Sequence, residues 1–130
     1  MNNSQNKSLS IVMHLVRLNA LITRRFGVQG LGIGDFMVLY YLNEAADGKL
    51  RRVDLAEKLG VTASGITRML LPMEKIGLVK KEVSKEDARV TFAVIAPGGK
   101  RMLGESIERA EMLSEEILYS NNAQKLQEIF

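Results

Sequence analysis

The 130-residue sequence contains no cysteine, no tryptophan, two prolines and one histidine. Without cysteine, the chain can form no disulfide, thiol redox switch or thiolate metal site. One histidine falls short of the several convergent ligands that a metal site needs, so we expect no metal and no other cofactor. No run of residues is apolar and long enough to span a bilayer, and the N-terminus lacks the features of a signal peptide. We therefore expect a cytoplasmic protein without membrane association.

Sequence motifs of catalysis are also missing. The chain has no G-x-S-x-G elbow, no P-loop and no G-x-G-x-x-G after a strand. The glycines at 27, 30, 32 and 34 join two predicted helices and follow no strand, so they do not indicate a phosphate-binding loop. A small helical enzyme would need a convergent acid–base pair, for which the sequence offers no candidate. We therefore expect no enzymatic activity.

Charge is distributed unevenly along a chain of otherwise ordinary composition. Hydrophobic residues make up 46% and charged residues 25%, which is typical of one soluble domain. The net charge of +3 combines +1 in residues 1–48, +6 in residues 49–101 and −4 in residues 102–130. A positive charge confined to one segment is the electrostatic pattern that phosphate binding requires, although an unevenly charged solvated surface would look the same.

Hydrophobic periodicity and turn residues predict a mainly helical chain with one small β-hairpin. Residues 1–7 are polar and are expected to form a disordered tail. Helices are expected at 8–26, 34–46, 52–59, 63–76, 97–121 and, as a last short element, 123–130. Strands are expected at 49–51, 78–83 and 90–95. Ser8 is the expected cap of the first helix, and either Thr62 or Ser64 is the expected cap of the fourth.

Residues 49–94 combine a short helix, a turn, a second helix and a charged hairpin, which is the pattern of a winged helix-turn-helix. The second helix has an apolar inward face, and its outward face is small and polar near its start. Such a helix can enter a DNA major groove while the hairpin tip, 84–89, meets the backbone or the minor groove. The predicted fold class is mainly α with a small β-hairpin, a winged helix-turn-helix flanked by N- and C-terminal dimerisation helices.

The flanking helices carry more apolar surface than one small domain can cover. A second copy of the chain would bury that surface, and packing of the two ends against each other is the alternative. We therefore divide a single domain, 1–130, into dimerisation helices at 8–33 and 97–130 and a winged helix-turn-helix lobe at 34–96.

Three motifs resemble the MarR (multiple antibiotic resistance regulator) family of transcription factors. The segment LAEKLGVT at 55–62 is similar to the family's first helix and turn. GITRM at 65–69, followed by LPMEKIGLV at 71–79, resembles its recognition helix and the exit into the wing. Asp87-Ala88-Arg89 matches the D-x-R of the wing. The chain departs from the family at Ile95-Ala96, where a Leu-Thr pair often caps the last long helix, and at Pro72, which should kink or loosen the recognition helix.

The resemblance implies an interleaved homodimer that binds double-stranded DNA at a pseudo-palindromic operator. It also implies a sequence-specific transcriptional regulator, usually a repressor, that releases DNA when a small aromatic or phenolic effector binds between the lobes. The alternative is a winged-helix module for protein–protein interaction without specific DNA binding. Steep salt dependence of binding would favour the DNA-binding function.

The candidate DNA-binding residues cluster on the second helix and the wing. Arg68 can donate two hydrogen bonds to guanine or hold a phosphate, and Arg89 is the expected minor-groove probe, oriented by Asp87. The alternative for each is a solvated surface side chain. The full set comprises Arg51, Arg52, Thr62, Ser64, Thr67, Arg68, Lys85, Asp87 and Arg89.

Three residues outside that set are candidates for contact with an effector. His14 and Arg17 lie one turn apart on the first helix, where Arg17 could meet an anionic ligand. Tyr40 lies on the crowded second helix and could line a pocket between the lobes. For His14 a partly buried place in the dimer lobe is the stronger interpretation, Arg17 could be a surface residue, and core packing is the alternative for Tyr40.

Overall fold

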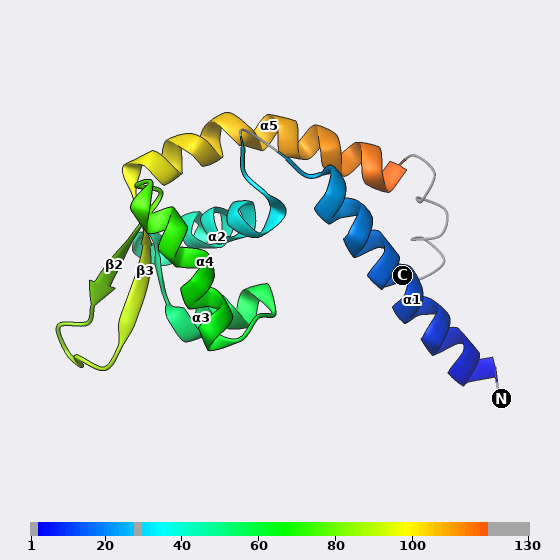
Figure 1. The fold of residues 1–130 in the computed structure, drawn as a ribbon, viewed down its shortest axis with the longest axis horizontal. Coiled ribbons are helices and arrows are strands. Elements are labelled where there is room, and N and C mark those ends of the chain that lie inside the picture. Colours follow the sequence, from blue (N-terminus) through cyan, green and yellow to red (C-terminus); the bar gives the residue numbers. More distant parts are fainter. Residues whose placement is uncertain (1–2, 28–29, 120–130) are drawn as a thin grey trace.

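The computed structural model describes residues 3–27 and 30–119, which fold into a helical lobe with a small sheet and two long outer helices (Figure 1). The elements are α1 (Asn3–Arg25), α2 (Ile33–Glu44), a 3₁₀ turn (Ala46–Gly48), β1 (Lys49–Arg51), α3 (Arg52–Leu59), α4 (Ala63–Lys75), β2 (Val79–Val83), β3 (Thr91–Ile95) and α5 (Pro97–Tyr119). This order confirms the predicted fold class. The helix predicted at 123–130 lies outside the described residues.

The N-terminal prediction was wrong by five residues. Helix α1 begins at Asn3, so residues 3–7 are helical and Ser8 lies inside the helix instead of capping it. No glycine or proline interrupts this stretch, and each further residue adds a hydrogen bond to an existing helix.

The core of the lobe forms around α2, as its apolar sequence predicted. Val38, Leu39 and Leu42 of this helix are completely buried. Leu55 of α3 and Leu70 of α4 pack into the same cluster and are also completely buried. The helix-turn-helix therefore rests on a closed apolar base, which fixes how α4 is presented to solvent.

The turn between α3 and α4 depends on backbone geometry that the sequence signals. Gly60 ends α3 with a positive φ of 70°, a conformation that glycine adopts without strain. The amide of Val61 then donates to the carbonyl of Ala56 at 3.0 Å, which satisfies the helix end. Helix α4 continues past Pro72 to Lys75, so proline does not end it. The ring lies on an exposed side of the helix.

The sheet holds the wing against the helix-turn-helix. Strand β3 lies in the centre, antiparallel to both neighbours, in the order β1-β3-β2. Leu50 pairs with Ala93, and Lys81 pairs with the same residue from the other side. Strand β1 leads directly into α3, so this pairing brings the start of α3 to the base of the wing. Pro97 is the first residue of α5, as predicted.

The two outer helices leave the lobe in a different manner. Helix α5 runs over the top of the lobe, and α1 projects away from it (Figure 1). Near the end of α1, Arg25 pairs with Glu116 of α5 at 3.0 Å. The rest of α1 exposes apolar side chains, with Leu9, Val12, Met13 and Val16 each more than half exposed. These four residues follow the spacing of one helical face, and we call them the α1 stripe.

Candidate nucleic-acid interface

The start of α4 is built to present short polar side chains and one arginine. Thr62 is the N-cap, and its hydroxyl accepts a hydrogen bond from the amide of Gly65 at 3.0 Å. This resolves the choice between the two predicted caps, because Ser64 instead lies exposed beside Thr62, with the two hydroxyl oxygens 3.3 Å apart. Ile66 and Leu70 face the core, so Arg68 is left on the exposed face.

Arg52 has a structural contact that the sequence did not reveal. Its guanidinium donates to the Glu74 carboxylate at 3.0 Å and to the Thr67 hydroxyl at 3.4 Å, linking the first turn of α3 to α4. The two charged side chains are only 21% and 24% exposed. Arg52 is one of the residues predicted to contact DNA, and this geometry shows that it also links α3 to the recognition helix. The partner lies 22 residues away, a separation at which no local pattern predicts a contact.

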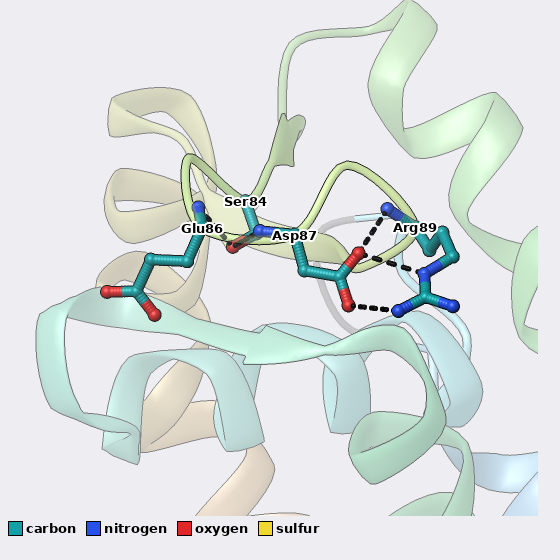
Figure 2. A network of polar contacts seen from close by, with 4 residues as sticks. All are labelled: Ser84, Glu86, Asp87 and Arg89. Carbon is teal, nitrogen blue, oxygen red and sulfur yellow. Dashed lines mark hydrogen bonds and ion pairs between the residues drawn. The ribbon is translucent and has the colours of Figure 1, made fainter.

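The wing tip is ordered by local hydrogen bonds, and Figure 2 shows the side chains of Asp87 and Arg89 pointing toward one another. The Ser84 hydroxyl accepts hydrogen bonds from the amides of Glu86 and Asp87, at 3.2 and 3.3 Å. Asp87 in turn accepts from the amide of Arg89 at 3.0 Å and from its Nε and Nη2 at 3.1 and 3.3 Å. The predicted contact between Asp87 and Arg89 is therefore present.

This pairing defines the electrostatics of the wing. Hydrogen bonds from the Arg89 side chain and amide hold the pKa of Asp87 below its usual value, and the charge of Arg51 adds to the effect. Asp87 therefore stays ionised at neutral pH. The Arg89 side chain remains 91% exposed, so the pair orients the guanidinium without covering it. Lys85 is also exposed at the tip.

A basic cleft joins the wing to the helix-turn-helix. It has a volume of about 290 Å³. Three arginines, Arg51, Arg52 and Arg89, line it together with Thr67 of α4. The cleft thus brings together four of the nine predicted DNA-binding residues, and Ser64 and Arg68 lie exposed on α4. Such a surface can contact phosphates with its arginines and approach bases with α4.

A second cavity lies between the lobe and the outer helices. It has a volume of about 530 Å³, with α2 on one side and α5 on the other. Tyr40 lines it, and its contact with an effector stays a prediction. His14 and Arg17, the other two candidates, are not among the lining residues. They lie on α1, where His14 is half-buried and Arg17 is exposed.

The fold and the exposed recognition surface define a winged helix-turn-helix protein. Residues 31–91 match the model of the MarR family. Over this segment, just under half of its length, the chain is similar to the MarR family. In the described residues, no helix is long and apolar enough to cross a membrane.

Individual relatives agree with this assignment. The chain is 30% identical over 87 residues to the HTH-type transcriptional repressor YetL of Bacillus subtilis, which covers 67% of this chain and 52% of that protein. It therefore spans about half the length of this curated relative. The transcriptional regulator BldR from Sulfolobus solfataricus is 27% identical, with a TM-score of 0.78 over 98% of this chain and 94% of the other.

A DNA complex shares the fold. The MarR family regulator Sco3205 from Streptomyces coelicolor, solved with DNA, is 23% identical, with a TM-score of 0.79 over 96% of this chain and 81% of the other. At this identity the similarity concerns the fold. These three relatives are all named as transcriptional regulators, which is consistent with the expectation that the chain is not an enzyme.

Proposed function

We propose that this protein is a sequence-specific, DNA-binding transcriptional regulator that acts as a homodimer. The observation that carries the proposal is the joint exposure of Arg68 on α4 and Arg89 on the ordered wing, beside a cleft lined by arginines. Arg68 suits the major groove, and Arg89 suits the minor groove or its phosphates. A function on DNA also supports a location in the cytoplasm, which is the location that the sequence predicts.

The dimer and the mode of regulation are further parts of this proposal. The α1 stripe is an apolar face that a second copy of the chain can cover. The resulting dimer would place two winged helix-turn-helix lobes on a pseudo-palindromic operator. We assign residues 8–33 and 97–130 to this dimerisation unit and 34–96 to the reading lobe. The name of the Bacillus subtilis relative supports a repressor. The cavity between α2 and α5 supports release by a small-molecule effector.

The test is selection from random duplex DNA at physiological salt, followed by sequencing of the retained fraction. We expect enrichment of an inverted repeat whose half-sites lie about one helical turn apart. Retention without any enriched sequence would contradict sequence-specific recognition. Absence of retention, or binding unaffected by salt, would favour the protein-interaction module.

Variants then test the residue assignments on the selected operator. Arg68→Ala and Arg89→Ala should each weaken binding by about tenfold or more, the usual loss for one specific arginine contact. Arg109→Ala, an exposed arginine of α5, is the matched control and should bind like the parent. Gel filtration should give the same mass for all three variants. Parental affinity in both test variants would show that the interface has been assigned to the wrong residues.

A further inference from the structure

The cavity between α2 and α5 has walls of two different chemical kinds. The α2 side is aromatic and includes Phe36, Tyr40 and Tyr41, with Phe26 completing it from the segment after α1. The α5 side carries the carboxylates of Glu111 and Glu115. Both glutamates line the cavity and are exposed to solvent, so neither carboxylate needs a buried partner. An occupant therefore meets rings on one side and negative charge on the other.

The four rings form a continuous series. Phe26 meets Phe36 edge to face, with the ring centroids 5.2 Å apart. Phe36 stacks on Tyr40 at 6.5 Å, and Tyr40 meets Tyr41 edge to face at 5.5 Å. The faces of aromatic rings are regions of negative electrostatic potential and attract cations. The aromatic wall thus favours the same sign of charge as the glutamates do.

Two hydroxyl groups of the cavity, those of Ser114 and Tyr40, have partners in the chain. Ser114 donates to the carbonyl of Ala110 at 2.8 Å, so its oxygen offers lone pairs to a ligand. A hydrogen bond to Glu44 and the charge of that residue raise the pKa of Tyr40, which therefore remains a neutral phenol. Both groups can accept a hydrogen bond from a ligand more readily than they can donate one.

Basic side chains are absent from the described lining of this cavity. Arg25 lies nearby on α1 but is paired with Glu116. Lys58 lies 5.6 Å from the centroid of the Tyr41 ring, which shows that this ring can already hold a cation from outside the cavity. A carboxylate or phenolate ligand would find no complementary charge among the lining residues.

We propose that the cavity binds an organic cation with an aromatic or apolar body, held between the α2 rings and the carboxylates of Glu111 and Glu115. This inference rests on the proposed function in one respect, since it names the class of effector for the same cavity. The volume of about 530 Å³ is in the range that accommodates drug-sized molecules. The proposed ligand is a cation, and in this charge it differs from the aromatic or phenolic effector that the resemblance implied.

The experiment compares two probes of the same shape and opposite charge. Tetraphenylphosphonium and tetraphenylborate are titrated into the protein without DNA, and binding is measured by isothermal calorimetry. We expect the phosphonium to bind and the borate to bind at least about tenfold more weakly. The double variant Glu111→Gln and Glu115→Gln should lose about tenfold in affinity for the phosphonium. Glu108→Gln, an exposed glutamate of α5 outside the lining, is the control and should bind like the parent.

Each outcome bears on the proposal separately from DNA binding. Equal or tighter binding of the borate, absence of phosphonium binding, or unchanged affinity in the double variant would overturn it. Operator affinity is measured on the same samples with and without the phosphonium. Phosphonium binding that leaves operator affinity unchanged would support the cation site and contradict effector-controlled release. Release of the operator by the phosphonium, lost in the double variant, would support both.

Discussion

The reading lobe, residues 34–96, and the outer helix α1 differ in how their apolar side chains are covered. In the lobe, α2, α3 and α4 bury side chains such as Leu39, Leu55 and Leu70 completely within one chain. In α1, a helix of 23 residues, Val12 and Val16 are 52% and 59% exposed. A helix with an uncovered apolar face needs tertiary packing for most of its stability.

This difference separates what each part can do alone. The lobe has a closed core and an ordered wing, so its recognition surface is organised within one chain. Helix α1 has an apolar face that the described residues of the chain leave uncovered. We therefore expect changes in α1 to act on assembly and changes in the lobe to act on recognition and local stability. The predictions below test this separation.

The largest effect is expected from charges placed in the α1 stripe. Val12→Glu with Val16→Glu should weaken the dimer by at least about a hundredfold, because two apolar contacts are lost and two charges enter the interface. Sedimentation analysis over a range of protein concentrations measures this directly.

The matched control is Asn6→Glu with Ser10→Glu, which has the same spacing on exposed polar positions of the same helix. We expect this control to remain dimeric. Equal association of both double variants would mean that the α1 stripe is not the interface. The lobe core of the stripe variant should remain folded, as followed by circular dichroism.

A smaller effect is expected from breaking the brace between α3 and α4. Glu74→Gln removes the charged acceptor of Arg52, whose Nε is already buried without a hydrogen-bond partner in the described residues. We expect a loss of about 2 kcal/mol in the free energy of unfolding, since a mostly buried cation loses its counter-charge. Urea denaturation measures it.

The control for the brace is a pair at the sheet. Lys49 and Glu82 are joined at 3.3 Å, with 32% and 45% of their side chains exposed. Glu82→Gln should cost no more than about 0.5 kcal/mol, as is usual for surface pairs. Similar losses in both variants would mean that Arg52 is no more than another surface contact.

The smallest effect is expected from Asp87→Asn in the wing. The variant keeps an oxygen that can accept from the Arg89 amide but loses the ionic contact with its guanidinium. We expect the ratio of operator affinity to non-specific affinity to fall by about fivefold, because Arg89 is less well oriented. Binding assays on operator and on random-sequence DNA give this ratio.

The pH dependence of the same contact follows from the lowered pKa of Asp87. Its folded-state pKa lies below the ordinary value of 3.8, so the ionic pair is complete at neutral pH and weakens only as the pH falls through that lowered pKa. The ratio between parent and Asp87→Asn affinities should therefore stay constant from about pH 5 to pH 8. A ratio that changes across this range would mean that another titrating group controls the wing.

Much of the fold could be predicted because local signals and tertiary packing agree. The apolar α2, the Gly60 turn and the hairpin each carry a sequence pattern that matches its final environment. The start of α1 could not be predicted, because polar residues are compatible both with an exposed helix and with a disordered tail. The brace from Arg52 to Glu74 joins distant parts of the sequence, and only folding shows that contact.

In the candidate sites, too, contacts between neighbouring residues could be predicted and contacts between distant segments could not. Asp87 and Arg89 lie two positions apart in the sequence, so sequence reasoning could identify their contact. His14 and Arg17 were chosen by residue type on α1, but the described cavity is lined from α2 and α5. Glu111 and Glu115 were not singled out, because acidic residues on a long exposed helix resemble a solvated face. Their importance appears only when α5 lies opposite the aromatic residues of α2.

The central claim is that the outer helices join two DNA-binding lobes into one dimer. Changing the spacing of the two half-sites tests this claim most directly. Insertion of about five base pairs between the half-sites turns one half-site to the opposite side of the duplex. We predict that operator affinity then falls to the level of a single half-site for the parent, while the monomeric Val12→Glu and Val16→Glu variant is unaffected. Parental affinity that is unchanged by the insertion would contradict the claim, because it would mean that each lobe binds DNA independently.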